Sequence, residues 1–190
     1  MKGYIYTMFR GADPGVGWRM TDPLFGRVPT LGACMPNIRR AVVPGDFVFV
    51  VSGSVSGVRQ YVVGGFRVAE KINALEAFER FPENRMRKHG DGTLVGNVIV
   101  NSDGSQNKHD YHKNFAKRIE NYIVGRDPIV LKTHDEIEVG REQTLEVLQD
   151  VFDTKRKSVG NIVSRWRRLN EAQIDTLSTW LKHIKQEGKK

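Results

Sequence analysis

Two histidines stand three residues apart in the segment HDYH, where His109 and His112 flank Asp110 and Tyr111. We expect this segment to form a short helix, on which both imidazoles would share a face and could transfer a proton or bind a metal. Two histidines and one aspartate do not complete a zinc site, and Cys34 is the chain's one cysteine. We therefore predict no metal, no cofactor and no catalytic residue. The histidines are either nucleotide contacts or ordinary surface and capping residues.

A long loop covers residues 10–36 and could wall a pocket for a flat base, because aromatic stacking tolerates any base and nearby polar groups read its edge. Serines that follow a buried strand could add hydroxyls to the same pocket. The alternative is that Trp18, Phe25 and Leu31 only pack over the end of the fold. The predicted base-pocket residues are Arg10, Phe25, Thr30, Cys34, Ser52, Ser54, His109 and His112. Cys34 is interpreted as a small, partly buried residue and not as a nucleophile.

Basic residues in two segments could bind phosphate. The chain carries a net charge of +8, and the excess falls after residue 154, which favours a polyanionic partner. Adjacent arginines beside a helix N-terminus can also hold a phosphate in a bidentate manner. The predicted phosphate-binding residues are Arg39, Arg40, Lys155, Arg156, Lys157, Arg165, Arg167 and Arg168. The alternatives are solvated helix faces and an ion pair between Arg39 and Asp46.

Strand patterns dominate the first two thirds of the chain. Residues 3–9 are aromatic and β-branched, and residues 47–53 form a continuous apolar run that is typical of a buried strand. The Pro-Gly-Asp turn at 44–46 precedes that run, and residues 58–72 predict an antiparallel partner with a bulge at Gly64 and Gly65. Further short strands are expected at 93–100 and 127–132. We predict an α+β fold with a small β-barrel over residues 1–135 and flanking helices.

Helical spacing dominates the rest, and we predict a basic helical extension over residues 136–190 that packs on the barrel. Apolar residues recur at helical intervals within 141–152, 158–169 and 170–184. Asn170 and Gln173 have the spacing of a capping box. An earlier short helix is expected at 73–81, with Asn73 as its N-cap.

A family resemblance accompanies these patterns. A strand that begins at Gly45-Asp46 after a basic helical turn resembles the entry strand of PUA-like domains, which include the EVE and ASCH groups. Residues 22–54 look like the nucleotide modification associated domain, type two. The matching residues are Thr30, Leu31, Cys34, Pro36, Ile38, Arg39, Ala41, Gly45, Asp46 and Ser52. Met35 stands where that family has lysine, and Gly32 stands one place before its expected pair of small residues. The resemblance covers roughly residues 3–132, with residues 96–110 its less specific part, and implies a PUA-like barrel and modified nucleotides as ligands.

We therefore predict a module that binds nucleic acid or a nucleotide and recognises a base, modified or not, in a pocket. Two alternatives remain: an enzyme of nucleotide or base modification that uses the region of His109 and His112, and a protein that forms homodimers through its C-terminal helices. The single cysteine excludes an intrachain disulfide, and no apolar run approaches the length of a membrane span. We expect a cytoplasmic protein with no membrane partner.

Overall fold

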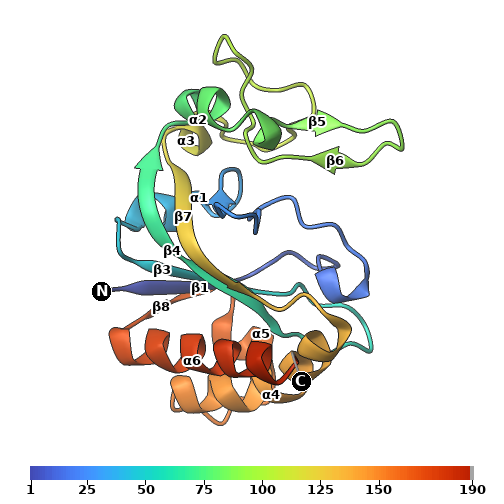
Figure 1. Ribbon diagram of the computed structural model, residues 1–190, viewed down its shortest axis with the longest axis vertical. Helices are drawn as coiled ribbons and strands as arrows, with labels where there is room; N and C mark the ends of the chain where they lie inside the picture. The colour runs from blue at the N-terminus through green and yellow to red at the C-terminus, as the bar shows by residue number, and fades with distance from the viewer. Residues whose placement is uncertain (189–190) are drawn as a thin grey trace. The chain divides into compact units, whose positions relative to one another are not determined.

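The computed structural model describes residues 1–188 and has an α+β fold (Figure 1). Lys189 and Lys190, which belong to the expected extension, lie outside the described residues. Within these residues one mixed sheet contains six strands in the order β2-β7-β4-β3-β1-β8, and a two-stranded ribbon pairs β5 with β6. The large sheet therefore ends at the edge strands β2 and β8. The expectation of a β-barrel is wrong, because no hydrogen-bonded ladder in the described chain joins β2 to β8 and the sheet is therefore open.

The described chain divides into two compact units that interleave along the sequence. Unit 1 consists of residues 1–20, 45–67 and 127–188, and unit 2 consists of residues 21–44 and 68–126. This division differs from the expected boundary at residue 135, because segments from both ends of the chain build unit 1. No helix among the described residues has the length and apolarity needed to cross a membrane.

The strand pair predicted at 47–53 and 58–72 forms the middle of the large sheet. Strand β3 (Phe47–Val51) is buried along its whole length and pairs in antiparallel register with β4 (Val62–Ile72). The register shifts between Val50 and Val51, which leaves Val63 without a partner in β3. The irregularity lies next to Gly64, in agreement with the bulge or bend predicted at Gly64 and Gly65. On its other side, β3 pairs in parallel with β1 (Gly3–Thr7). Strand β7 (Tyr122–Val130) lies on the other side of β4.

Helices α4 (His134–Val151) and α6 (Glu171–Glu187) pack against one another in unit 1 (Figure 1). The capping box predicted at Asn170 and Gln173 is confirmed, and Thr133 with Glu136 forms a second one at the start of α4. The predicted apolar face of α6 is fully buried; its members are Ile174, Leu177, Leu181 and Ile184. Packing inside unit 1 thus accounts for the apolar face that suggested a homodimer.

Residues 158–169 do not form the single helix that their spacing predicted. Helix α5 ends at Val163 (Val159–Val163), and Trp166–Leu169 forms strand β8 instead. Strand β8 pairs antiparallel with β1, and the amide of Thr7 donates to the carbonyl of Arg165. The free edge of β1 supplied hydrogen-bond partners that outweigh local helical periodicity, a common tertiary override of propensity. Strand β8 of the C-terminal region is therefore part of the large sheet.

Unit 2 contains shorter elements around its own apolar core. They are β2 (Thr30–Leu31), α1 (Pro36–Ala41), α2 (Ala74–Arg80), β5 (Arg87–Lys88), β6 (Leu94–Val95) and α3 (Ala116–Ile119). Short 3-10 turns lie at Pro14–Val16 in unit 1 and at Pro82–Asn84 in unit 2. The predicted cap of α2 is confirmed, since the side chain of Asn73 accepts from the amide of Glu76. Residues of α2 pack against Tyr122 and Val124 of β7 in this core.

The segment that carries the two histidines is not helical. Residues 107–115 contain turns at 108–109 and at 115 and are otherwise irregular, and a helix begins only at Ala116. The amide side chain of Gln106 donates to the carbonyl of Asp110 at 3.0 Å and to the carbonyl of His112 at 3.2 Å. These bonds close the segment into a loop, and Tyr111 is 82% exposed. The helical spacing of aromatic residues here was misleading, because the aromatic at Tyr111 faces solvent.

Candidate functional site

A cavity of about 530 Å³ lies in unit 1 and brings together two residues that the sequence assigned to different roles. Ser54 was a predicted base contact and Lys157 a predicted phosphate contact, and both line this cavity. The complete lining is Ser54, Val58, Arg59, Gln60, Arg141, Glu142, Leu145, Lys157, Ser158 and Val159. These residues come from the loop between β3 and β4, from α4, and from the start of α5.

The β3–β4 loop is held in place by hydrogen bonds at its base. The hydroxyl of Ser52 accepts from the amide of Tyr61 at 3.1 Å, and the side chain of Gln60 donates to the carbonyl of Ser52 at 2.7 Å. At Gly53 a side chain has no room, because an added Cβ would lie 1.9 Å from the carbonyl oxygen of Phe9. This close approach anchors the loop, so that Ser54 and Arg59 are presented from a fixed base.

The opposite wall of the cavity is fixed by a buried ion pair. The guanidinium of Arg141 donates to both carboxylate oxygens of Asp13, with each N–O distance 3.0 Å. Arg141 also donates to the carbonyl of Arg59, and its guanidinium lies 4.8 Å from the centre of the Tyr61 ring. Burial, with the charge of Asp13 adding to it, raises the pKa of Tyr61 and keeps that phenol neutral. A bidentate pair of this kind fixes α4 against the loop at 11–17.

The charges at the cavity mouth favour an anionic ligand. Arg59 and Lys157 are exposed, while the charge of Arg141 is offset by Asp13, and Glu142 supplies one negative charge. Lys155 and Arg156 are exposed next to Lys157 in the sequence, although Arg156 donates to the carbonyl of Asn161. Arg59 and Lys157 are therefore the cations best placed to contact a phosphate.

The interior of the cavity is partly apolar. Val58, Leu145 and Val159 supply aliphatic surface, and Ser54 and Ser158 supply hydroxyls. A second cavity of about 480 Å³ shares Val58, Arg59, Arg141 and Glu142 with the first. The two cavities thus share a wall that contains Arg59.

The remaining basic residues of the C-terminal region differ in availability. Arg165 and Arg168 are exposed beside or on edge strand β8. Arg167 is half-buried, donates to the carbonyl of Ile162 at 3.1 Å, and lies 3.9 Å from the centre of the Phe152 ring. Arg167 therefore holds α5 and the end of α4 together, which leaves the phosphate prediction with little support at this position.

The other predicted base-pocket residues divide between the two units. Arg10 and Ser52 belong to unit 1, whereas Phe25, Thr30, Cys34, His109 and His112 belong to unit 2. Arg10 is exposed and Phe25 is half-buried. Ser52 is fully buried and already accepts the Tyr61 amide. The prediction of a base contact at Ser52 is thus not supported by its surroundings.

A buried polar network occupies the part of unit 2 that contains Thr30. The Thr30 hydroxyl accepts from the side chain of Asn97 at 3.0 Å, and the phenol of Tyr122 donates to Asn97 at 2.7 Å. Burial raises the pKa of Tyr122, so this phenol also stays neutral. Thr30 is therefore committed to the interior of unit 2, and its hydroxyl is not exposed to a ligand.

Asp22 organises the end of the long loop. Its carboxylate accepts from the amides of Gly32 at 2.8 Å, Ala33 at 3.0 Å and Cys34 at 2.5 Å, and also from the Asn97 side chain at 2.9 Å. The loop is thus ordered by one internal anion that binds successive backbone amides. Nothing in the residue pattern singled out Asp22 or Asn97 before the structure was known.

The thiol of Cys34 lies at the end of this loop, next to the Asp22 carboxylate. Burial raises the pKa of the Cys34 thiol far above its usual range, and the charge of Asp22 adds to the effect. A thiol held neutral in this way is a poor nucleophile, which agrees with the interpretation of Cys34 as a structural residue.

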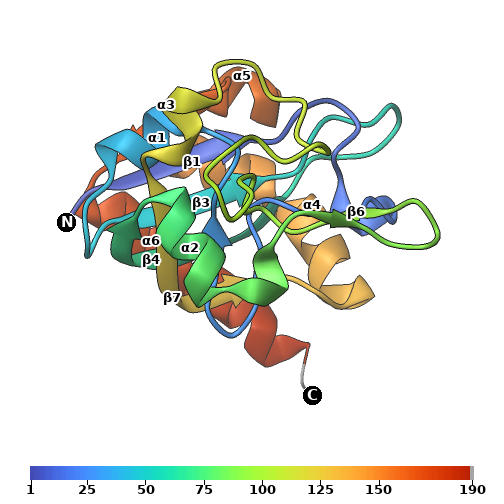
Figure 2. The same ribbon diagram turned by 90° about the horizontal axis from the view of Figure 1, so that it is seen from above.

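Arg39 is fully buried and donates to backbone carbonyls, so it cannot reach a phosphate in solvent. Its guanidinium bonds to the carbonyls of Ala33, Cys34, Arg118 and Asn121. The expectation that Arg39 binds phosphate is wrong for this structure. The adjacent Arg40 is exposed and lines a cavity of about 370 Å³ with Lys117 and Arg118, where α1 and α3 lie side by side (Figure 2). Its phosphate role stays a prediction.

The histidines form one defined interaction. Nδ1 of His112 lies 2.5 Å from an oxygen of the buried Asp110 carboxylate, and the half-buried His109 stands outside this pair. Burial raises the pKa of Asp110, but the hydrogen bonds from His112 and Gln106 outweigh it and hold the pKa below its usual range. No cluster of three or more His, Cys, Asp and Glu side chains that could hold a metal occurs within residues 1–188.

Sequence reasoning missed most of the residues that line the 530 Å³ cavity. Arg59 had one usable signal, since it is a lone cation in a loop rich in Ser and Gly between two strands. Leu145 and Glu142 carried none, because their spacing is that of any amphipathic helix. No model of a known protein family matches the chain, and a search of curated proteins finds no match. The resemblance to the nucleotide modification associated domain therefore stays a prediction.

Proposed function

We propose that this protein is a binding module for nucleic acid or a nucleotide, and that one base or nucleotide sits in the unit 1 cavity. The observation that carries the proposal is that Ser54, Arg59 and Lys157 line one cavity of about 530 Å³. A volume of this size falls within the range of small-molecule sites. Arg59 and Lys157 would contact phosphate, Ser54 and Ser158 would bond to the base or sugar, and the aliphatic wall would cover the face of the base.

Two features support a polyanionic ligand over a single small anion. The net charge of the chain is +8, and Lys155 and Arg156 extend the positive charge beyond the cavity mouth. Contacts of this kind supply most of the affinity of nonspecific nucleic-acid binding. The cavity has aliphatic walls in place of the aromatic ring that we expected from the sequence. Base recognition would therefore rest on van der Waals contact and hydroxyl hydrogen bonds, and less on stacking.

The finer assignment to a PUA-like fold is part of the proposal. Its support is the passage from helix α1 through the turn at 44–46 into the buried strand β3. The open edges of the sheet count against a closed barrel. The assignment adds a reason to include modified bases among the ligands tested.

The test is fluorescence anisotropy with short single-stranded DNA and RNA oligonucleotides, unmodified and carrying modified bases, over a salt series. Substitutions are preferable to truncation before Lys155, because truncation would remove β8 and α6 from unit 1. The Arg59→Ala/Lys157→Ala double variant should weaken binding at least tenfold. The slope of log affinity against log salt should become less negative by about 1.4, because each phosphate contact to a single strand contributes about 0.7 and two contacts are lost.

The matched control is the Arg87→Ala/Lys88→Ala double variant, which removes the same charge from exposed residues of β5 in unit 2. It should change the affinity far less than the cavity variant. Leu145→Ala should weaken binding of preferred bases without changing the salt slope, since it removes only apolar contact. Equal effects of the two double variants, or no binding by the wild type at low salt, would refute the proposal.

A second candidate is an enzyme that acts on a nucleotide, and the Asp110–His112 pair favours it. A buried carboxylate on Nδ1 orients an imidazole so that its other nitrogen can accept a proton. The test is turnover of free nucleotides and oligonucleotides by the wild type and by His112→Ala. Turnover that survives this substitution, or no turnover at all, removes this candidate.

A further inference from the structure

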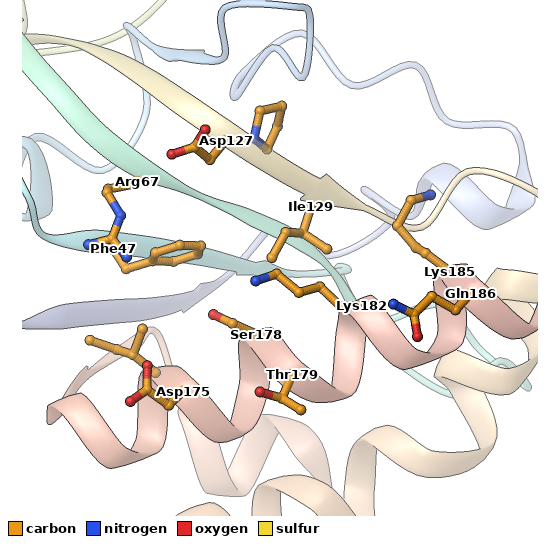
Figure 3. Close-up of a pocket in the computed structure, with 12 residues that line it drawn as sticks. Phe47, Arg67, Asp127, Ile129, Asp175, Ser178, Thr179, Lys182, Lys185 and Gln186 are labelled. Carbon is orange, nitrogen blue, oxygen red and sulfur yellow. The ribbon is translucent and has the colours of Figure 1, made fainter.

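Another cavity in unit 1, separate from the two that share Arg59, has a different lining and no role in the proposed function. It measures about 650 Å³ and lies between helix α6 and the strands β3, β4 and β7 (Figure 3). The apolar part of its lining consists of Phe47, Pro128, Ile129 and Ile174. The polar part consists of Arg67, Asp127, Asp175, Ser178, Thr179, Lys182, Lys185 and Gln186.

The three cations in this lining differ in what they already contact. Lys185 donates to the carbonyl of Val130 and pairs with Glu136, both at 2.9 Å, so its charge is already balanced by a carboxylate. Lys182 is exposed, and Figure 3 shows its ammonium directed from α6 into the space beside the strands. Within the described residues we find no ion pair or hydrogen bond that occupies Lys182.

Arg67 faces the same space from strand β4. One of its terminal nitrogens donates to the carbonyl of Gly45 at 3.1 Å, and its guanidinium lies 5.9 Å from the centre of the Phe47 ring. The side chain is half-buried, so its position is fixed more tightly than that of a surface arginine. Arg67 and Lys182 therefore present positive charge from the strand side and from the helix side of one cavity.

Ser178 provides an independent sign of a ligand. Its hydroxyl oxygen is buried, and among the described residues it has no hydrogen-bond partner. Thr176 on the same helix satisfies its hydroxyl within the helix, by donating to the carbonyl of Ala172 at 2.9 Å. A buried hydroxyl without a partner carries a desolvation cost that a ligand acceptor can relieve. Ser178 lines the cavity and faces the same space as Lys182 (Figure 3).

We propose that this cavity binds a small organic anion, with one carboxylate or phosphate monoester attached to an apolar body. The anionic group would lie between Arg67 and Lys182. It would accept a hydrogen bond from Ser178 after that side chain rotates toward the cavity, because the hydroxyl oxygen is buried in the free protein. The apolar body would pack against Phe47, Ile129 and Ile174. Asp127 and Asp175 in the same lining disfavour a ligand with more than one anionic group, which sets this site apart from the polyanion site proposed at Arg59 and Lys157.

The experiment is isothermal titration of the full chain with benzoate, phenyl phosphate and inorganic phosphate. Benzoate and phenyl phosphate distinguish a carboxylate from a phosphate ligand, and inorganic phosphate reports on the anion without an apolar body. We expect saturable binding of benzoate or phenyl phosphate below about 10 mM, and Lys182→Ala should weaken it about tenfold. Ser178→Ala should also weaken it, while the Tm of the free protein stays unchanged or rises because an unpaired hydroxyl is removed.

Thr176→Ala is the matched control, since it removes a hydroxyl from the same helix that is already satisfied, and it should leave binding unchanged. Saturation by neither aromatic probe would overturn the proposal. So would binding that is insensitive to both Lys182→Ala and Ser178→Ala. Equal affinity for inorganic phosphate and phenyl phosphate would mean that the apolar wall contributes nothing, and it would overturn the proposal as well. Oligonucleotide binding at the Arg59 cavity is measured separately, so either proposal can fail alone.

Discussion

The arginines of α1 in unit 2 and the basic residues at 155–168 in unit 1 carry the same charge but have different surroundings. Arg39 turns into unit 2 and bonds to four backbone carbonyls, whereas Lys155 and Lys157 are exposed. Arg39 is buried because the four carbonyls that it contacts need a hydrogen-bond donor inside unit 2. A run of positive charge therefore does not reveal which cations face a ligand.

A similar difference separates two arginines of unit 1 from two of its lysines. Arg141 bonds to a carboxylate and a carbonyl, Arg167 bonds to a carbonyl, and both lie over aromatic rings. Lys155 and Lys157 do neither and stay in solvent. In this protein the buried arginines stabilise the fold, while the exposed lysines and Arg59 supply charge to the candidate site.

The largest effect on stability is expected when the neighbouring arginines of α1 are replaced by alanine one at a time. Arg39→Ala should lower the free energy of unfolding by more than about 4 kcal/mol, because it leaves buried carbonyls without donors. Arg40→Ala should change it by less than about 0.5 kcal/mol, since that side chain is exposed. Urea unfolding followed by circular dichroism measures both, and similar losses would contradict the distinction.

A smaller loss is expected from the buried ion pair of unit 1. Asp13→Asn should lower the free energy of unfolding by about 3 kcal/mol, because Arg141 loses its buried bidentate carboxylate and keeps only the exposed Glu138, 3.5 Å away. The effect should persist in high salt, since the pair is shielded from solvent. A loss that disappears at high salt would show that this pair behaves like a surface pair.

Glu136 gives a test with a defined pH dependence. Burial raises its pKa, but the amide of Lys132, the ammonium of Lys185 and the amide of Thr133 outweigh burial and hold the pKa below its usual range. Because the folded-state pKa lies below the unfolded one, its stabilisation is complete above about pH 5 and is lost as the pH falls through the folded value. Glu136→Gln should cost about 1 to 2 kcal/mol at pH 7 and much less at pH 3. Urea unfolding at both pH values measures the difference in stability between the wild type and Glu136→Gln. A difference that does not change with pH would contradict the lowered pKa of Glu136.

The smallest effect is expected at the exposed ion pair between Arg80 and Glu70. Hydrogen bonding to Arg80 holds the pKa of Glu70 below its usual range, but both side chains are about two-fifths exposed. Solvent screens such pairs, and Glu70→Gln should cost less than about 1 kcal/mol and less still in high salt. Thermal unfolding at low and high salt measures this difference, and a loss as large as that of Asp13→Asn would erase the contrast between buried and exposed pairs.

Local patterns predicted much of the fold but little of the candidate site. The buried run at 47–51 and the caps at Asn73 and Asn170 depend on nearby residues, so the sequence reveals them directly. Strand β8 depends on the distant edge of β1, and its helical spacing concealed that pairing. The cavity depends on contacts between the loop at 54–60, α4 and the start of α5, which no periodicity encodes. Ser54 and Lys157 were predicted for their chemistry, and the structure supplied the fact that they line one cavity.

The most direct test of the nucleotide-binding proposal is to locate the contact itself. Oligonucleotides that carry 5-iodouracil can be cross-linked to the full chain by light, and the attached peptides identified by mass spectrometry. The proposal predicts cross-links to residues 54–60 and 142–159, and their loss in the Arg59→Ala/Lys157→Ala variant. Cross-links confined to unit 2, at the loop of Phe25 or the loop of His109, would contradict the proposal. They would instead support a base-binding site in unit 2.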